Sequence, residues 1–326
     1  MDENQEANFE EKGFQLFLPH AFERVTEAKR RNIRFSHYTS AYAALQIIEK
    51  NAVWMRNAVL MNDFSEVQHG QRCLAAAWRD DKIGGRLRHL LETLQTGLSA
   101  RVADAFDKRA NDRGVQSYLV AISEHGSDSI DEDRYGRLSM WRAYGGDTNV
   151  AFVFNNKPFF SDSNPLNAFT SPVLYKNEDG FKENFLSLIE GLEANRDFLN
   201  EMGADQVLRH LTNALNFAAL STKHPAFAEE REWRVIYSPT IYPSDKIPFN
   251  IETVSGVPQR VYKLNFKNYP DEGFVGASLP ELLEEIIIGP TSYPWPIYDA
   301  IATKLEEAGV ADPWNKVRIS NIPLRR

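Results

Sequence analysis

Apolar residues recur along this chain with the periods of helices and strands. Within residues 41–50, Ala44, Leu45, Ile47 and Ile48 fall on one side of a 3.6-residue repeat, which predicts an amphipathic helix. Similar spacing and helix-end signals predict helices over residues 19–31, 41–50, 63–108 with a break at 84–85, 138–144 and 178–219. Short apolar or alternating runs predict strands over residues 33–38, 53–55, 116–123, 149–154, 172–175, 230–237, 261–266, 285–288 and 317–319. This irregular interleaving predicts an α+β fold with a mixed, mainly antiparallel central sheet and helical insertions.

Two of the predicted helices begin at residues that can cap them. Thr39 or Ser40 can accept a hydrogen bond from the first turn of the helix over residues 41–50. Asp63 followed three residues later by Glu66 has the form of a capping box, which explains both carboxylates without a functional role.

The same patterns indicate how the chain is organised. Residues 1–18 are predominantly acidic and polar at their start, and we expect a flexible tail there. Residues 19–326 are expected to form a single α+β domain. Residues 80–113 and 178–222 carry no strand candidate, so we expect them to be helical insertions in that domain.

Composition excludes several broad classes of protein. Hydrophobic residues make up 43% of the 326 residues and aromatic residues 12%, enough for a large core, so the chain is not disordered. Asp and Glu total 45 against 37 Lys and Arg, and the net charge of −8 disfavours non-specific binding to a polyanion. Cys73 is the only cysteine, which excludes a disulfide framework. With no secretory signal and no apolar run of membrane-spanning length, we expect a cytoplasmic protein without membrane association.

Common catalytic and cofactor motifs are absent from the sequence. It contains no G-x-G-x-x-G, G-x-x-x-x-G-K-[ST], H-E-x-x-H or G-x-S-x-G motif, which disfavours dehydrogenases, P-loop ATPases, zincins and serine hydrolases. The seven histidines show no metal-ligand spacing, and we expect no metal. Asp128, Asp131 and Asp133 lack the pattern of a calcium loop and are interpreted as a solvent-exposed turn.

Two segments carry side chains that folding alone does not require. His37 ends the first predicted strand, where it is either a satisfied polar residue or a ligand-binding group. Trp141 and Tyr144 are three residues apart in a predicted helix and therefore share a face. They form either part of the core or an aromatic platform for a cofactor.

A third segment is acidic. Strand alternation over residues 230–237 places Glu230, Glu232 and Arg234 on one face and Trp233 on the other. Two carboxylates beside a guanidinium form either a structural ion-pair network or a site. Glu232 lies further inside the strand than Glu230, so we expect its position to be better fixed.

These residues occur in the order found in a known family. The chain resembles the bacterial "domain of unknown function 2971" family over residues 33 to 290. The resemblance is carried by His37-Tyr38-Thr39, Trp54, Met61-Asn62-Asp63-x-x-Glu66, Trp141-x-x-Tyr144-Gly145, Glu230-x-Glu232-Trp233-Arg234 and Ile286-Ile287-Ile288-Gly289. The family name itself implies no activity.

A more distant resemblance implies one. The order of His37, a central aromatic and a late glutamate is similar to that of ADP-ribosyltransferase-like toxins. Through this resemblance, His37 would bind the ribose of NAD, Tyr144 or Trp141 would contact the nicotinamide, and Glu232 or Glu230 would be the catalytic carboxylate. Tyr38 and Arg234 would complete the cofactor contacts.

The implied function is an NAD-dependent ADP-ribosyltransferase-like enzyme acting in a toxin or phage-defence setting. NAD would be its substrate, no metal would be required, and the acceptor would be a nucleic acid or a protein. Because a catalytic group on a rigid element is placed more accurately, we favour Glu232 as the carboxylate facing the oxocarbenium-like transition state, with Glu230 assisting. We expect His37, an aromatic and a glutamate to converge on one cleft.

Two further functions remain open on the sequence. One is a metal-dependent nuclease or hydrolase that uses His37, Asp63, Glu66, Glu230 and Glu232. The other is a non-catalytic binding module of a defence system.

Overall fold

The chain folds into two compact units rather than the single domain expected for residues 19–326. In the computed structural model, the described residues are 3–58, 60, 64–126, 129–254 and 256–323. Unit 1 comprises residues 1–26, 57–117 and 171–228, and unit 2 comprises residues 27–56, 118–170 and 229–326. Both stretches predicted as insertions lie within unit 1, where their helices share a core of their own.

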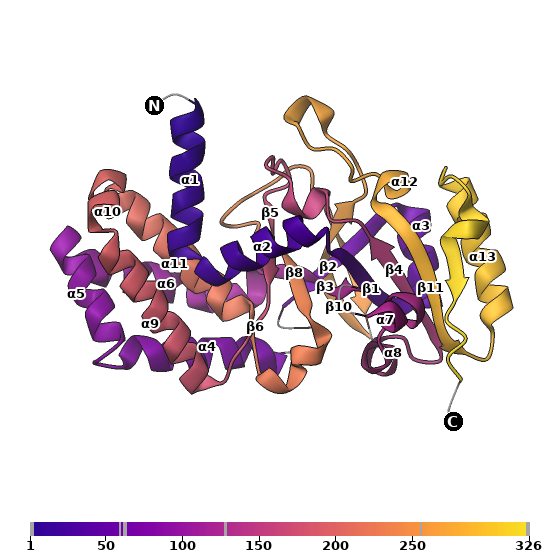
Figure 1. Cartoon of the computed structure of the whole chain (residues 1–326), viewed down its shortest axis with the longest axis horizontal. Helices are drawn as coiled ribbons and strands as arrows, with labels where there is room; N and C mark the ends of the chain where they lie inside the picture. The colour runs from indigo at the N-terminus through magenta and orange to yellow at the C-terminus, as the bar shows by residue number, and fades with distance from the viewer. Residues whose placement is uncertain (1–2, 59, 61–63, 127–128, 255, 324–326) are drawn as a thin grey trace. The chain divides into compact units, whose positions relative to one another are not determined.

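Unit 1 is built mainly from helices (Figure 1). They are α1 (Glu3–Phe17), the first part of α2 (Pro19–Arg31), α4 (Phe64–Arg79), α5 (Gly84–Leu94), α6 (Leu98–Gln116), α9 (Glu178–Ala194), α10 (Arg196–Met202) and α11 (Ala204–Leu220). Two short strands, β6 (Leu174–Tyr175) and β7 (Thr222–Lys223), pair in parallel. The 3-10 turn η2 (Pro225–Glu230) leads out of this unit.

Helix α1 replaces the flexible tail expected for residues 1–18. Phe17 is 2% exposed and belongs to the core of unit 1, and Phe9 and Leu16 pack against that core. These apolar residues fall on one side of the helix at a spacing of seven to eight positions, while acidic residues occupy exposed positions between them. Cys73 of α4 is buried in the same core.

Unit 2 is an α+β sandwich around one large sheet. Its strands are β1 (Arg34–Ser40), β2 (Ala52–Asn57), β3 (Tyr118–His125), β4 (Thr148–Phe154), β5 (Ala168–Pro172), β8 (Glu232–Tyr237), β9 (Phe249–Val254), β10 (Val257–Asn265), β11 (Leu283–Thr291) and β12 (Val317–Ile319). Its helices are α3 (Ala41–Lys50), α7 (Ile130–Tyr135), α8 (Leu138–Tyr144), α12 (Leu279–Leu282) and α13 (Pro294–Glu307). Its 3-10 turns are η1 (Pro158–Phe160), η3 (Pro270–Glu272) and η4 (Pro313–Lys316).

The sheet confirms the predicted mixed, mainly antiparallel topology. The strand order is β12-β11-β4-β1-β3-β2-β10-β9, and β8 adds to β3 and to β5. The β11–β12 pair is parallel, whereas the pairs that join β1, β3, β4 and β8 are antiparallel.

One face of the sheet packs against α8, and we call it the α8 face. The register aligns Tyr38 of β1, Ala151 of β4 and Ile287 of β11 across three neighbouring strands. All three residues are buried together with Met140 and Trp141 of α8. Helix α8 therefore fixes its position through the apolar side chains that it places on this face.

The opposite face packs against α3 and α13, which lie side by side (Figure 1), and we call it the α3 face. Phe152 of β4 and Ile286 of β11 are partners in the register and belong to the core cluster beneath these helices. Ile48 of α3 and Leu305 of α13 contribute to the same cluster. Each side of the sheet is thus covered in its central region, which explains the nearly continuous apolar runs of the central strands.

Strand β9 and helix α13 lie outside the sequence predictions. Strand β9 is at the edge of the sheet and its side chains are largely exposed, so the sequence there lacks a buried alternation. Helix α13 begins with prolines at its first positions, which fit a helix start but resemble loop residues in an isolated pattern. Among the described residues, no helix combines the length and the apolar character needed to cross a bilayer.

Candidate functional site

Strand β8 places Glu232 and Arg234 on the α8 face. Glu232 is the partner of Ser123, and Ser123 is the partner of Ser36, which alternates on β1 with Tyr38. The Nε atom of Arg234 donates to Oε1 of Glu232 at 2.7 Å, and Nη2 donates to Oε2 at 3.4 Å. The side chains of Arg234 and Glu232 are only 2% and 5% exposed. This ion pair is therefore a buried, charge-compensated element of the fold.

Glu230 does not continue this strand. Strand β8 begins at Glu232, whereas Glu230 is the last residue of η2. Between them, Arg231 has φ of +43°, a left-handed conformation that residues other than glycine seldom adopt. The prediction that Glu230, Glu232 and Arg234 share one strand face is therefore wrong for Glu230, because the left-handed residue interrupts the alternation.

Glu230 instead meets Tyr144 at the end of α8. The hydroxyl of Tyr144 donates to Oε1 of Glu230 at 3.4 Å, across 86 positions of sequence. The Ser139 hydroxyl of α8 donates to Glu229, the residue before Glu230, at 3.0 Å. Two side-chain contacts therefore join α8 to the end of η2. Tyr144 is 39% exposed and Glu230 is partly buried. A phenol and a carboxylate are thus presented together where solvent reaches them.

Arg137 fixes the backbone beside this pair. It precedes α8 and its side chain is 7% exposed. Its guanidinium donates to the carbonyl of Glu230 at 2.8 Å, to the carbonyl of Glu124 at 3.0 Å and to Oε1 of Glu132 at 2.6 Å. A buried planar cation that satisfies three acceptors from three segments holds each of them in place.

Trp141 and Tyr38 belong to the core beneath α8. Trp141 is 2% exposed and Tyr38 8%. Their rings meet edge to face with centroids 4.6 Å apart, and the indole N–H of Trp141 donates to the carbonyl of Tyr135 at 2.9 Å. The Tyr38 hydroxyl accepts the backbone N–H of Arg137 at 2.9 Å, and burial raises the pKa of this phenol. Of the two predicted aromatics, Tyr144 therefore offers the exposed ring.

His37 lies on the α3 face. Its partner on β4 is Phe152, while its neighbour Tyr38 is opposite Ala151 on the other face. The Nδ1 atom of His37 lies 3.0 Å from the carbonyl of Ala121, so Nδ1 carries the proton of this hydrogen bond. Burial lowers the pKa of His37, and the hydrogen bond partly offsets this. The side chains of His37 and of the Glu232–Arg234 pair thus leave the sheet on opposite faces, so the register gives no support to their expected convergence.

The capping box of Asp63 and Glu66 remains a prediction. Asp63 lies outside the described residues, as does the side chain of Glu66. The metal-dependent alternative that uses both carboxylates therefore also stays a prediction. In contrast, the other capping prediction is confirmed, because the Ser40 hydroxyl accepts the N–H of Ala43 at the start of α3.

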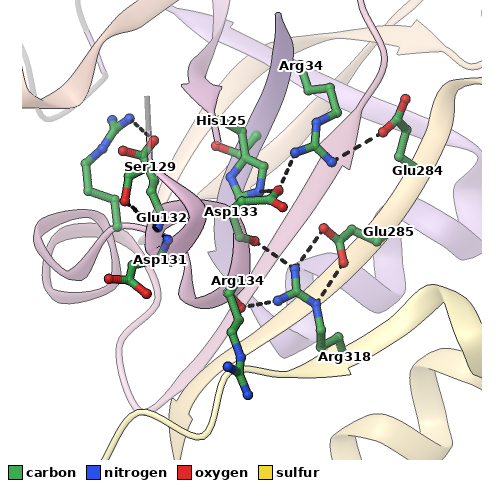
Figure 2. Close-up of polar contacts among 12 residues, drawn as sticks. Arg34, His125, Ser129, Asp131, Glu132, Asp133, Arg134, Glu284, Glu285 and Arg318 are labelled. Atoms are coloured by element: carbon green, nitrogen blue, oxygen red, sulfur yellow. Dashed lines mark hydrogen bonds and ion pairs between the residues drawn. The ribbon is translucent and has the colours of Figure 1, made fainter. Parts of the chain in front are cut away.

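A second polar cluster, which the sequence analysis missed, lies on the α8 face (Figure 2). We call it the His125 cluster, and its members are Arg34, His125, Asp133, Glu284, Glu285 and Arg318. Arg34 and His125 are direct partners on β1 and β3. Arg34 is two residues from Ser36 on β1, which places Arg34 and His125 on the same face as the Glu232–Arg234 pair.

Helix α7 carries Asp133 over this end of the sheet. Its N-terminus is capped by Ser129, whose hydroxyl accepts the backbone N–H groups of Asp131 and Glu132. Where a solvent-exposed turn was expected, Asp131 and Asp133 lie in a helix, and Asp133 also accepts a hydrogen bond from Arg34. Asp128 lies outside the described residues. Because Ser129 caps the first turn, this polar segment forms a short helix.

The carboxylates of the cluster are paired with two arginines. Arg34 donates to Oδ1 of Asp133 and contacts Oε2 of Glu284 at 3.4 Å. Arg318 donates to both oxygens of Glu285, at 2.9 and 2.8 Å, and to the backbone carbonyl of Asp133 at 2.8 Å. The two guanidinium groups thus connect α7 to β1, β11 and β12 (Figure 2).

His125 differs from the other members of the cluster in the hydrogen bonding of its ring nitrogens. It is 1% exposed, and within the described part of the chain neither ring nitrogen has a hydrogen-bond partner. Its Nε2 atom lies 3.6 Å from Oδ1 of Asp133. Burial, reinforced by the charge of Arg34 and opposed by that of Asp133, lowers the pKa of His125 to about 4. The imidazole is therefore neutral at neutral pH, with one ring nitrogen able to act as an acceptor or ligand.

Comparison with known proteins supports the family resemblance and adds no activity. The family model described as "Protein of unknown function (DUF2971)" matches residues 140–235. This segment contains Tyr144, Glu230, Glu232 and Arg234, together with part of α8 and most of β8. No curated protein and no solved structure matches the chain. The predicted family resemblance is thus confirmed over residues 140–235, the segment that the family model matches.

Proposed function

We propose that the chain is an NAD-consuming, ADP-ribosyltransferase-like enzyme that uses Glu230 as its carboxylate and Tyr144 as its aromatic partner. The observation that carries the proposal is the 3.4 Å contact between the Tyr144 hydroxyl and Oε1 of Glu230. Two of the residue types that the resemblance implies, far apart in sequence, meet in this contact at a partly exposed position. The acceptor is a macromolecule, and a toxin or phage-defence role is the setting that the resemblance implies.

The surroundings of the two glutamates support Glu230 over Glu232. Arg234 occupies both carboxylate oxygens of Glu232, which is 5% exposed. A substrate would have to displace this buried guanidinium before it could reach the carboxylate, and that would break a buried ion pair. Glu230 has no such barrier of burial, since its side chain is partly exposed.

The chemistry needs few groups from the protein. The bond between C1′ of the ribose and N1 of nicotinamide breaks, and its electron pair leaves with the nicotinamide. The developing oxocarbenium-like cation is stabilised by the Glu230 carboxylate. The C1′ atom then bonds to a nucleophile of the acceptor, whose proton passes to solvent. The exposed ring of Tyr144 can stack on the nicotinamide while its hydroxyl orients Glu230.

Four other predicted residues, Tyr38, Trp141, Glu232 and Arg234, have supporting places in this proposal, as does Arg137. Arg137, Tyr38 and Trp141 hold α8 and the Glu230 backbone in position from below. The Glu232–Arg234 pair anchors the start of β8, two residues after Glu230. They are positioning residues rather than cofactor contacts.

The experiment measures nicotinamide release from NAD by the purified chain, with and without cell extract as a source of acceptor. Glu230→Gln keeps the size and hydrogen-bonding capacity of the side chain but removes its charge, and we expect the rate to fall by about 10²–10³-fold. Glu229→Gln is the matched control, because Glu229 is the preceding residue and also accepts a hydroxyl from α8. Tyr144→Phe removes one hydrogen bond and keeps the ring, so its rate should fall by about tenfold.

The outcome at Glu232 separates chemistry from folding. Glu232→Gln removes the carboxylate that is paired with buried Arg234, so we expect a loss of stability of about 3–5 kcal/mol but near-normal activity of the molecules that remain folded. The proposal fails if folded Glu230→Gln retains full activity, or if the wild-type chain releases no nicotinamide under either condition. Cleavage of nucleic acid that requires Mn²⁺ would instead favour the nuclease alternative.

A further inference from the structure

We propose that the His125 cluster is a binding site for a divalent transition-metal ion such as Zn²⁺, with His125, Asp133 and Glu285 as its protein ligands. The site lies entirely within unit 2 and does not depend on the proposed transferase activity. It would join three segments of that unit, namely the end of β3, helix α7 and strand β11.

The geometry of the donor atoms suits a single ion. A ring nitrogen of His125 and one carboxylate oxygen each from Asp133 and Glu285 all lie within 4.8 Å of one another. Ligands that surround one zinc ion at about 2.0–2.2 Å are separated by distances of about 3–4 Å, so small side-chain adjustments would close the site.

His125 provides the independent indication that something is bound. A neutral imidazole has one donor and one acceptor, and burying it without partners costs free energy. The side chain of His125 is 1% exposed, neither nitrogen has a hydrogen-bond partner among the described residues, and Nε2 points to within 3.6 Å of Asp133. A metal ion bound to Nε2 would satisfy this nitrogen where no protein group does.

The donor set also limits the identity of the ion. Imidazole nitrogen and carboxylate oxygen are both zinc ligands, and three protein ligands leave the fourth tetrahedral position for water; the same donors also suit Mn²⁺. Mg²⁺ and Ca²⁺ prefer oxygen ligands throughout. We therefore expect the order of affinity to favour Zn²⁺ strongly over Mg²⁺.

The two arginines are compatible with an ion. Within the cluster, Asp133, Glu284 and Glu285 carry three negative charges, whereas Arg34 and Arg318 carry two positive charges, so the balance is −1 with neutral His125. Each carboxylate oxygen has two lone pairs, and the single hydrogen bonds from the guanidinium groups leave one of them for the ion. Arg34 and Arg318 would then act as outer groups that orient the ligands.

The backbone next to His125 and next to Glu285 allows the ligand-bearing segments to come close together. Gly126 follows His125 with φ of +65°, and a Cβ atom there would lie 2.8 Å from Nη2 of Arg34 and 2.9 Å from Oδ1 of Asp133. A larger residue would separate β3 from α7. On the other side, a register shift between Leu283 and Glu285 marks a bulge in β11, a device that redirects side chains at functional positions.

The experiment measures metal binding by the full chain after treatment with a chelator. Equilibrium dialysis with elemental analysis, and calorimetric titration with Zn²⁺, Mn²⁺ and Mg²⁺, give stoichiometry and affinity. We expect one Zn²⁺ per chain and a higher thermal midpoint when Zn²⁺ is in excess over its dissociation constant. In His125→Asn and Asp133→Asn, the affinity should fall by more than the roughly 10–100-fold that loss of an outer-shell partner costs.

Control variants distinguish Zn²⁺ binding at the His125 cluster from Zn²⁺ binding by side chains on the protein surface. His224 is an exposed histidine outside the cluster, so His224→Asn should bind Zn²⁺ as the wild type does. Glu285→Gln tests the third ligand and keeps a carbonyl oxygen that can accept from Arg318. Circular dichroism checks the folding of each variant. The proposal is overturned if the wild-type chain binds no Zn²⁺ in the micromolar range. It is also overturned if His125→Asn and Asp133→Asn bind with unchanged stoichiometry and affinity, because the ion would then sit elsewhere. Since no NAD is used, neither result bears on the transferase proposal.

Discussion

Replacing Gly289 with alanine should destabilise unit 2, although the same change usually stabilises a strand. Gly289 lies in β11, and its φ is not in the left-handed region, so alanine can adopt the backbone conformation. Such a replacement normally stabilises by about 0.4–1 kcal/mol, because alanine restricts the unfolded chain. The sign of the effect therefore depends on what the added Cβ atom meets.

The added atom would meet the largest side chain beneath α8. It would lie 2.7 Å from Cε3 of Trp141 and 2.8 Å from Cβ of Asn149. Neither neighbour can move away easily. The Trp141 indole is hydrogen-bonded to Tyr135 and packed edge to face on Tyr38, while the Asn149 amide donates to two backbone carbonyls, each at 3.0 Å.

The expected size of the effect follows from these contacts. Overpacking of a well-filled core costs about 1–3 kcal/mol, and the gain from restricting the unfolded chain offsets part of it. We therefore expect Gly289→Ala to lower the free energy of unfolding by about 1–2 kcal/mol. Gly191 of α9 is the control, since a Cβ atom there would have no neighbour within 4 Å. Gly191→Ala should raise stability by up to about 1 kcal/mol, the helix propensity difference.

A double-mutant cycle with Trp141→Phe tests the mechanism. The phenyl ring is smaller than the indole, so it should relieve the clash at residue 289 while losing the hydrogen bond to Tyr135. We expect the double variant Gly289→Ala, Trp141→Phe to be more stable than the sum of the single changes by about 1 kcal/mol. Urea unfolding followed by circular dichroism measures each variant, with hydrogen exchange at β11 assigning the change to unit 2. Strict additivity, or a stabilising effect of Gly289→Ala alone, would refute the reasoning.

Three further predictions concern other buried groups. Because burial lowers the pKa of His37, the unfolded chain takes up a proton at higher pH than the folded chain. The free energy of unfolding should therefore fall as pH decreases below about 6.5. In acid titrations, His37→Gln should weaken this pH dependence, whereas His89→Gln, at an exposed position, should leave it unchanged. Arg137→Met should cost about 3–5 kcal/mol in urea unfolding, and Arg137→Lys should restore little of it, because one ammonium cannot reach three acceptors in a plane. Gly70→Ala should destabilise unit 1 despite the higher helix propensity of alanine, because its Cβ atom would lie 2.4 Å from the carbonyl oxygen of Ala219; an unchanged or higher thermal midpoint would contradict this close helix packing.

Elements defined by local signals could be predicted from the sequence almost to the residue. Helices α3 and α8 and strand β12 have the predicted bounds, 41–50, 138–144 and 317–319. In α3, a capping serine and an apolar stripe fall within one window and agree with the tertiary environment. Such agreement leaves little for distant contacts to change.

The candidate site was only partly accessible to the same reasoning, because its geometry depends on two non-local facts. The meeting of Tyr144 with Glu230 requires the packing of α8 on the sheet, which no local pattern specifies. The sequence does not predict the left-handed conformation of Arg231 either, because arginine has no preference for it and the surroundings must impose it. As a result, the alternation rule assigned Glu230 to a strand that begins two residues later.

The His125 cluster shows a different limit. Its sequence signal is weak: His125 ends an apolar strand, and Asp133 lies in a polar segment that resembles a loop. Glu285 comes from β11, and the last segment of unit 1, residues 171–228, separates it in sequence from Asp133, so no ligand spacing could reveal it. Only the antiparallel arrangement of β1, β3, β4 and β11 brings these ends of the strands together.

The two polar regions on the α8 face are mechanically connected through Arg137. Its guanidinium binds Oε1 of Glu132 at 2.6 Å and the backbone carbonyl of Glu230 at 2.8 Å. Glu132 is the neighbour of Asp133 in the six-residue helix α7, so an ion held by Asp133 would restrict the whole helix. That restriction would pass through Arg137 to the backbone of Glu230, because buried charge-assisted hydrogen bonds are short and directional. A metal site in the His125 cluster can therefore support the geometry of the Tyr144–Glu230 pair without taking part in its chemistry.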